Sequence, residues 1–223
     1  MSPEMIPDVG FSDNANQRTP CVLVLDGSSS MEGDPITELN KGLKTFETQL
    51  KANPLSALRV QVLVIRIGGW EAAEVLSDWC DAIDFTAPTV TANGSTPLGN
   101  GMSLALQKIE EQKRAYDANG ITSTRPWIIM ISDGEPNDQG WEQVADQCKT
   151  AEQQKKVVVY PIGTASADFD ALGRFSNRSP KKLSGLNFNE LFIWLSRSMS
   201  VVSNSSPGDR VQLPATGWEE VEV

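Results

Sequence analysis

The sequence predicts an α/β protein of three-layer α-β-α type, with a Rossmann-like, doubly wound and mostly parallel sheet of about six strands and one antiparallel edge strand. Two observations lead to this fold class. Short apolar runs alternate along the chain with amphipathic segments of about 12–16 residues, which is the order of repeated βαβ units with right-handed crossovers. The apolar runs are also unbroken, as in parallel strands that helices cover on both faces. The clearest runs lie at 21–25, 127–132 and 157–162, and we expect them to be central strands.

The remaining elements follow from the same patterns, in chain order. A helix is expected over 35–51, where Pro35 suits the first turn and apolar side chains recur on one face. Residues 58–67 change from alternating to continuously apolar and predict a strand, and a strand-like piece near 79–85 predicts the antiparallel edge strand. Further helices are expected near 98–109, 140–154, 168–175 and 188–202.

Length and composition indicate one sizeable domain. The chain has 223 residues, 39% of them hydrophobic, enough for a full core. We expect this domain over 19–202, between a flexible N-terminal arm at 1–18 and a polar, acidic tail at 203–223. No apolar stretch approaches the roughly 20 residues of a membrane helix, and no signal-peptide pattern is present at the start. The net charge of −10 disfavours nucleic acid, so neither a membrane nor a nucleic acid is an expected partner.

Cysteine and histidine usage narrows the chemistry. Cys21, Cys80 and Cys148 lie far apart and form no CxxC pair, which favours free thiols and a cytoplasmic location. The chain contains no histidine. Catalysis by Ser-His-Asp or Cys-His groups and ordinary zinc chemistry are therefore excluded.

Three polar turns carry the functional signal. Asp26, Ser28 and Ser30 directly follow the first apolar run. Asp133 follows a later run, and Thr96 lies between them in Gly-Ser-Thr-Pro-Leu, just before a helix. Ligands of open α/β sheets bind beyond the carboxyl ends of the strands, so we expect the three turns to converge. Carboxylate and hydroxyl oxygens are suitable ligands for a hard cation such as Mg²⁺.

A purely structural interpretation is also open for each turn. Asp-x-Ser-x-Ser by itself could cap a helix or form an Asx turn, although three agreeing segments weigh against this. Ser29 and Ser95 have no assigned role. Glu135 and Asp138 are expected to be solvated turn residues, and Glu135 could border the site.

Taken together, the three segments resemble the metal-ion-dependent adhesion site of von Willebrand factor A domains. The resemblance covers about residues 20–202 and includes the order of the elements. Details at 35–43 and 132–136 are similar to the bacterial tellurium-resistance-associated TerY-type subgroup. The resemblance implies direct binding of Mg²⁺ or Mn²⁺, with Ca²⁺ a weaker candidate. Its implied ligands are the hydroxyls of Ser28, Ser30 and Thr96, whereas Asp26 and Asp133 often act through water.

The function implied is a metal-dependent protein-interaction module, not an enzyme. Hydroxyl ligands leave much of the ion's charge uncompensated, so the Glu or Asp carboxylate of a protein partner can take the open position. The TerY-type resemblance implies a bacterial stress-response, tellurium-resistance or defence complex, with a kinase or phosphatase encoded nearby as a candidate partner.

Two alternatives remain open from the sequence. The first is a hydrolase or phosphatase that uses the divalent metal, and the second is a structural subunit with an inactive metal site. Against the first, Ser28 stands where a haloacid-dehalogenase-type phosphatase needs its second carboxylate. Met31 likewise stands where a GxSxG hydrolase needs its last glycine.

Overall fold

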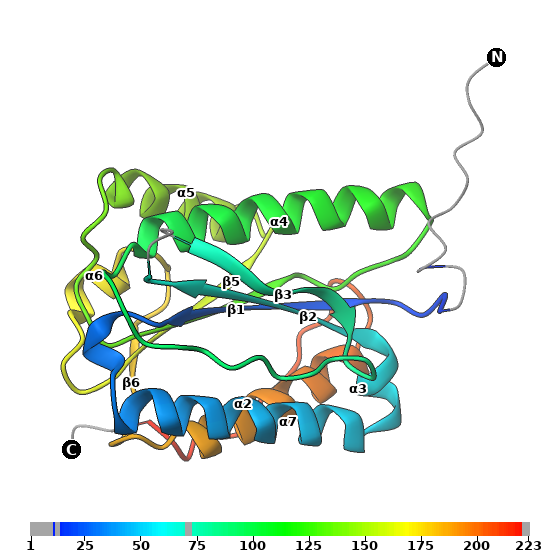
Figure 1. Cartoon of the computed structure of the whole chain (residues 1–223). Coiled ribbons are helices and arrows are strands. Elements are labelled where there is room, and N and C mark those ends of the chain that lie inside the picture. Colours follow the sequence, from blue (N-terminus) through cyan, green and yellow to red (C-terminus); the bar gives the residue numbers. More distant parts are fainter. Residues whose placement is uncertain (1–10, 12–13, 70–72, 220–223) are drawn as a thin grey trace.

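A computed structural model describes residues 11, 14–69 and 73–219, and it contains a six-stranded sheet between two helical layers (Figure 1). The strand order is β3-β2-β1-β4-β5-β6. Five strands run parallel, and β3 pairs with β2 in the antiparallel sense. The predicted fold class is thereby confirmed. The strands are β1 (Thr19–Asp26), β2 (Val60–Ile67), β3 (Ala73–Asp81), β4 (Trp127–Ser132), β5 (Val158–Gly163) and β6 (Lys181–Lys182).

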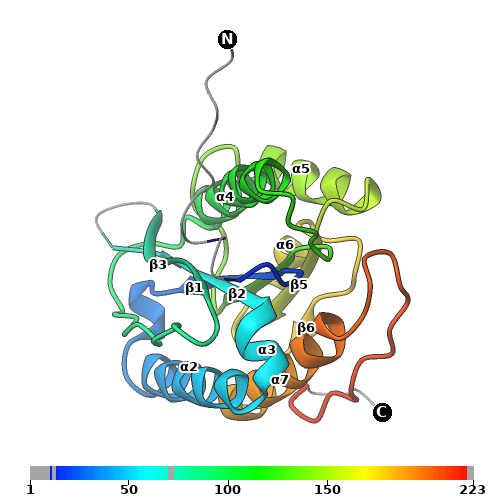
Figure 2. The same cartoon turned by 90° about the vertical axis from the view of Figure 1, so that its right-hand side faces the viewer.

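Helices cover both faces of this sheet, as Figure 2 shows when the molecule is viewed along the strands. One layer holds α2 (Asp34–Ala52), α3 (Pro54–Arg59) and α7 (Phe188–Ser203), and the other holds α4 (Leu98–Ala118) and α5 (Trp141–Gln153). Two short elements complete the fold: the 3₁₀ turn η1 (Ser29–Met31) after β1, and α6 (Phe169–Gly173) after β5.

Strand β1 explains why the central runs are apolar without interruption. Successive side chains of a strand point to opposite faces. Leu23 and Leu25 therefore pack in the core beneath α2 and α7, whereas Val22 and Val24 pack in the core beneath α4 and α5. All four side chains are fully buried. Residues 21–25 of β1 thus face a core on one side or the other, and each of them is apolar.

Helix α4 approaches the sheet closely at Gly101. A Cβ atom at this position would lie 2.3 Å from Ile67 Cγ2 and 3.1 Å from Val24 Cγ1. We expect Gly101→Ala to lower the free energy of unfolding by about 1–3 kcal/mol, since overpacking outweighs alanine's better helix propensity. Urea denaturation measures this, with the exposed Ser103→Ala on the same helix as control. Equal stability of Gly101→Ala and the wild type would contradict the close packing.

The predicted antiparallel edge strand is present, but it spans Ala73–Asp81, so the predicted bounds of 79–85 were wrong. After Asp81 the chain turns, and the amides of Asp84 and Phe85 both donate to the carbonyl of Asp81. The Phe85 ring packs in the core edge-on to Phe46, with ring centroids 6.3 Å apart. Ala82 and Phe85 are therefore buried in the core, whereas Ile83 is exposed, and these residues do not extend the strand.

The second strand begins at residue 60, two residues later than expected, because a short helix precedes it. Asn53 caps this helix, α3, by accepting hydrogen bonds from the amides of Leu55 and Ser56 at 3.1 and 2.9 Å. Pro54 occupies its first turn, where a missing N–H costs nothing. Residues 58 and 59, which were expected to begin the strand, form the end of α3. Strand β6, which has only two residues, was not predicted.

The C-terminal segment returns to the sheet and enters the core. Trp218 is 1% exposed and packs edge-on against Trp194, with ring centroids 5.5 Å apart. Its carbonyl accepts a hydrogen bond from the Ser184 amide at 2.8 Å. Glu219 pairs with Lys181 of β6 at 2.8 Å. The last described residues thus cover the edge of the sheet at β6.

This packing bears on the expected tail and arm. Trp218 and Glu219 contact the domain, and 220–223 lie outside the described residues. At the other end, Arg18 is fully buried and pairs with Asp81 at 3.2 Å, whereas 1–10 and 12–13 are not described. The arm, domain and tail boundaries stay predictions.

The three cysteines are free thiols. Cys21 and Cys148 are buried and Cys80 is half-buried. Burial raises the pKa of the Cys148 thiol to about 12 and raises that of Cys21 still further. These two thiols are therefore protonated core residues near neutral pH.

Candidate metal centre

The carboxyl ends of β1 and β4 bring two acidic turns together. The two strands pair in parallel, with Leu25 opposite Ile131, and the chain leaves β1 for β2 on its other side. This gap between β1 and β4 is the topological switch point at which α/β sheets bind ligands. Asp26 ends β1 and Ser132 ends β4, so both lie at this edge, and Asp133 follows directly.

Asp26 is held rigidly at the centre of this edge. Its side chain is fully buried. One carboxylate oxygen, Oδ1, accepts the amide hydrogen of Ser28 at 2.8 Å, and the other, Oδ2, accepts the hydroxyl of Ser132 at 2.5 Å. Two hydrogen bonds to the ionised form compensate part of the desolvation of this carboxylate.

A chain of hydroxyl groups connects Asp26's turn to Asp133. Ser28 Oγ lies 2.9 Å from Ser30 Oγ, and Ser30 Oγ donates to Asp133 Oδ1 at 2.8 Å. The turn η1 makes this possible because it folds Ser30 back over Ser28, while the buried Met31 anchors the turn in the core. Four of the five residues singled out from the sequence are therefore joined by hydrogen bonds or by a single hydroxyl contact.

Thr96, the fifth residue, lies against the second acidic turn. Its amide donates to Asn137 Oδ1 at 3.1 Å, and its carbonyl accepts the Asn137 amide at 3.2 Å. Its hydroxyl points to the same turn, since a Cβ placed on Gly134 would lie 3.3 Å from Thr96 Oγ1. Thr96 is only 6% exposed, yet no described group hydrogen-bonds its hydroxyl. The structure leaves this oxygen available for a ligand next to Asp133.

Several supporting residues escaped the sequence analysis. Ser132 and Asn137 were not singled out, and Asp138 was wrongly taken for a solvated turn residue. Asp138 instead accepts the amides of Gly99 and Asn100 at 3.2 and 2.8 Å, which caps the start of α4. The polar residues that follow the Ser-Asp-Gly turn could have indicated such a cap, but the amides that Asp138 accepts lie 39 and 38 residues away in the chain. Glu135 is exposed, as expected.

The buried side chain of Arg66 holds the turn that follows Asp26 in place. Its guanidinium, 5% exposed, donates to the carbonyls of Thr91 and Gly27 at 2.8 and 3.2 Å, to Asn93 Oδ1, and to Glu74 at 3.1 Å. A Cβ on Gly27 would lie 2.5 Å from Arg66 Nε and 2.6 Å from the Thr91 carbonyl. The turn after Asp26 therefore needs glycine at this position because a buried arginine fills the space beside it.

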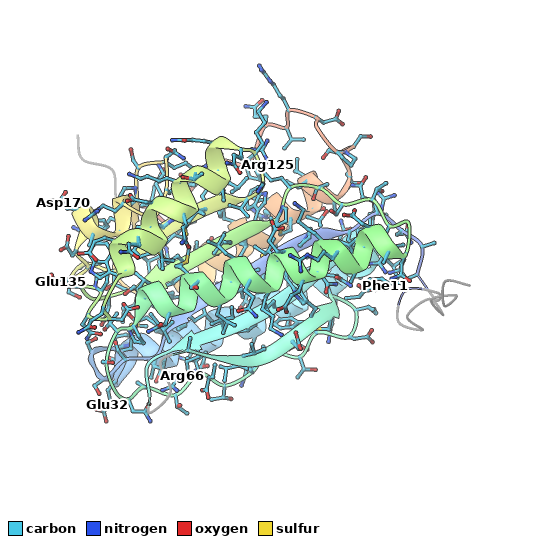
Figure 3. All side chains as sticks on the ribbon, turned by 90° about the horizontal axis from the view of Figure 1, so that it is seen from above. Phe11, Glu32, Arg66, Arg125, Glu135 and Asp170 are labelled. Carbon is cyan, nitrogen blue, oxygen red and sulfur yellow. The ribbon has the colours of Figure 1, made fainter. Side chains whose placement is uncertain are left out.

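The two carboxylates of the site influence each other electrostatically. Burial raises the pKa of the Asp133 carboxyl, and the negative charge of Asp26 raises it further, while the hydrogen bond from Ser30 acts in the opposite direction. Figure 3 shows Glu32 and Glu135 at this same end of the molecule. The described residues contain no cluster of three or more Asp, Glu, Cys or His side chains suited to a metal. Any ion held here would depend on hydroxyl oxygens as well as on the two carboxylates.

Comparison with known proteins identifies the family. The profile of the von Willebrand factor type A domain matches residues 21–190. The chain belongs to this family. Von Willebrand factor A domains are protein-interaction modules, and the sheet, its order and its switch point agree with that assignment. No curated protein sequence matches this von Willebrand factor A domain.

Solved structures share the fold at low sequence identity. The von Willebrand domain of the pilus tip protein Mfa5 from Porphyromonas gingivalis aligns with a TM-score of 0.62 and 10% identity, covering 87% of this chain and 99% of that one. The pilus adhesin SpaC from Lactobacillus rhamnosus GG gives 0.63 and 13%, covering 84% and 32%. Proximal thread matrix protein 1 from the mussel byssus, solved with a zinc-occupied MIDAS motif, gives 0.54 and 14%, covering 84% and 49%. The chain thus spans half or less of the last two proteins.

No helix among the described residues combines the length and apolar character needed to cross a membrane.

Proposed function

We propose that this von Willebrand factor A domain is a metal-dependent adaptor, which binds Mg²⁺ or Mn²⁺ and docks an acidic side chain of a protein partner on the ion. The observation that carries the proposal is the hydrogen-bonded network of side-chain oxygens at the β1/β4 switch point. Asp26 accepts the Ser132 hydroxyl and the Ser28 amide, and the hydroxyls of Ser28 and Ser30 lead on to Asp133.

The donor set fits a small, hard cation. Ser28, Ser30 and Thr96 would hold the ion through their hydroxyl oxygens, with Asp26 and Asp133 in direct or water-mediated contact. The Thr96 hydroxyl, to which no described residue hydrogen-bonds, and the raised pKa of the nearby Asp133 carboxyl both support a cation at this place. Mg²⁺ accepts few protein carboxylates and keeps several water sites, whereas Ca²⁺ prefers more oxygen ligands. The zinc-occupied motif of the byssus protein supports a divalent metal in a site of this type.

A partner carboxylate suits the open position for electrostatic reasons. The ion's charge is only partly neutralised by hydroxyl ligands, so an additional anion is attracted to it. Without the ion, the same carboxylate would face Asp133, Glu135 and a chain of net charge −10. Docking should therefore depend on the metal and not on the apo surface.

The proposed setting is a bacterial stress-response or tellurium-resistance complex in the cytoplasm, where a kinase or phosphatase encoded beside this chain supplies the acidic residue. The support for it is the resemblance of the 35–43 and 132–136 segments to TerY-type sequences, together with the free thiols. The named solved neighbours come instead from pili and from a byssus. Co-purification with the products of flanking genes tests this setting directly.

Thr96→Val should weaken binding without harming the fold. Valine has nearly the shape of threonine, so the substitution preserves the packing of this nearly buried loop residue. It removes only the hydroxyl, to which no described residue hydrogen-bonds. We expect a loss of roughly 10-fold or more in Mn²⁺ affinity and a matching loss of partner retention in Mg²⁺ buffer. Calorimetry and pull-down with a partner encoded by a flanking gene measure the two effects.

Thr96→Ser, which restores the hydroxyl, should recover both properties, and Ser95→Ala serves as the neighbouring control. Partner retention that is equal for all variants, with and without EDTA, would mean that the complex forms through another face. Turnover of a phosphate ester by the Mn²⁺-loaded protein would instead favour the hydrolase alternative.

A further inference from the structure

A second polar hollow lies at the end of the sheet opposite the candidate metal centre. It has a volume of about 460 Å³ and lies between the starts of β4 and β5 and the C-terminal segment at 205–213. A neighbouring hollow of about 320 Å³ shares Arg125 and Arg178 with it. Figure 3 shows Arg125 next to the C-terminal segment and far from Glu135 and Glu32.

Four basic side chains surround this hollow, in a protein whose net charge is −10. Arg125 comes just before β4, Lys155 before β5, and Arg178 after α6, while Arg210 comes from the returning C-terminal segment. Arg125, Lys155 and Arg210 form no ion pair and no side-chain hydrogen bond with any described residue. Their charges are therefore available to a ligand.

Two acidic groups lie nearby, and of the four cations only Arg178 forms an ion pair with a described residue. The carboxylate of Glu152 is occupied by neutral donors. It accepts the amides of Val159 and Asn177 at 2.9 and 2.7 Å and the Ser176 hydroxyl at 2.9 Å. Its contact with Arg178 is long, at 3.7 Å. Asp209, the one acidic residue among those lining the larger hollow, accepts the Ser206 amide at 2.8 Å.

An aromatic ring and several apolar side chains form the remaining walls of the hollow. The guanidinium of Arg178 lies over the Tyr160 ring, 5.2 Å from its centroid, which restrains the orientation of this cation. Apolar side chains from β5, α7 and the C-terminal segment form the remainder of the wall. They are Val158, Val202, Val211 and Leu213.

We propose that this hollow binds a small organic phosphate with two or more phosphate groups, of the size of a nucleoside diphosphate. Its volume lies in the range of small-molecule sites. Arginine side chains bind phosphate oxygens in a bidentate manner, and the apolar wall can receive the organic part. A long polyanion such as nucleic acid would extend beyond the hollow over a protein of net charge −10, whereas a compact anion inside the hollow faces four cations and one carboxylate, that of Asp209.

The test is titration calorimetry with ADP, AMP and inorganic pyrophosphate as probes, in EDTA so that no metal takes part. We expect ADP and pyrophosphate to bind more tightly than AMP, and ADP affinity to fall about 10-fold or more in the double variant Arg125→Gln/Arg210→Gln. The matched control Arg114→Gln/Arg197→Gln removes two exposed arginines outside the hollow and should leave ADP affinity within about two-fold.

We expect Asp26→Asn to bind ADP as tightly as the wild type, because Asp26 lies in the candidate metal centre and not in this hollow. The two proposals can therefore fail independently of each other. The proposal is overturned if none of the three probes binds below about 10 mM, or if the control double variant weakens ADP as much as the test variant. It is also overturned if a single-stranded oligonucleotide or a phosphoserine peptide binds more tightly than ADP and displaces it, which would assign the hollow to a macromolecule.

Discussion

Asp26→Asn is expected to reduce the affinity for Mn²⁺ by roughly 100-fold or more while the domain stays folded. The amide oxygen can still accept the Ser28 amide, and the amide NH₂ can donate to the Ser132 hydroxyl that now donates to Asp26. The shape of the turn is thus retained. The negative charge at the centre of the proposed ligand set is lost, and with it the main attraction for a divalent ion. Titration calorimetry gives the affinity, and circular dichroism reports the fold.

Asp146→Asn provides the matched control for this experiment. It removes the same charge from an exposed position on α5, so a general effect of net charge would appear in both variants. An Mn²⁺ affinity of Asp26→Asn equal to that of the wild type would rule out the metal centre at the β1/β4 switch point. A loss of the same size in both variants would show that the ion is attracted by the acidic surface as a whole.

Trp218→Ala is expected to lower the free energy of unfolding by about 3–5 kcal/mol. The indole is buried between the edge of the sheet and α7, edge-on to Trp194, and its removal leaves a cavity that the surrounding backbone cannot easily fill. The loss should be seen in urea denaturation without a change in Mn²⁺ affinity, because the metal centre lies at the β1/β4 edge and contains no residue of the C-terminal segment.

Two further variants of this segment sharpen the result. Trp218→Phe should retain most of the stability, since the ring still fills the site and the indole N–H has no hydrogen-bond partner among the described residues. Gln212→Ala, at an exposed position, should change stability by about 0.5 kcal/mol or less. A loss below about 1 kcal/mol for Trp218→Ala would mean that residues 203–219 behave as the detachable tail expected from their composition.

The sequence alone determined the sheet and the convergence of the polar turns. The runs at 21–25 and 127–131 are apolar at every position because each has a core on both faces, and their shortness favours buried strands. Parallel strands end at one edge of a sheet, so residues that follow two neighbouring strands must lie close together. The positions of Asp26, Ser28, Ser30 and Asp133 followed from that rule.

The tertiary structure alone decided where weakly patterned segments pack. Phe85 and Trp218 are single aromatic residues in polar surroundings, and nothing in their neighbours shows that each fills a gap in a core built by residues far away in the chain. The same holds for Arg66, which donates to the carbonyls of Thr91 and Gly27, and for Asp138, which accepts the amides of Gly99 and Asn100; these partners lie 25 to 39 residues away in the chain. Local periodicity reports which face of an element is buried, but not which distant group completes the core or holds a loop. Those contacts depend on three-dimensional packing, and they are what gives the polar turns their final geometry.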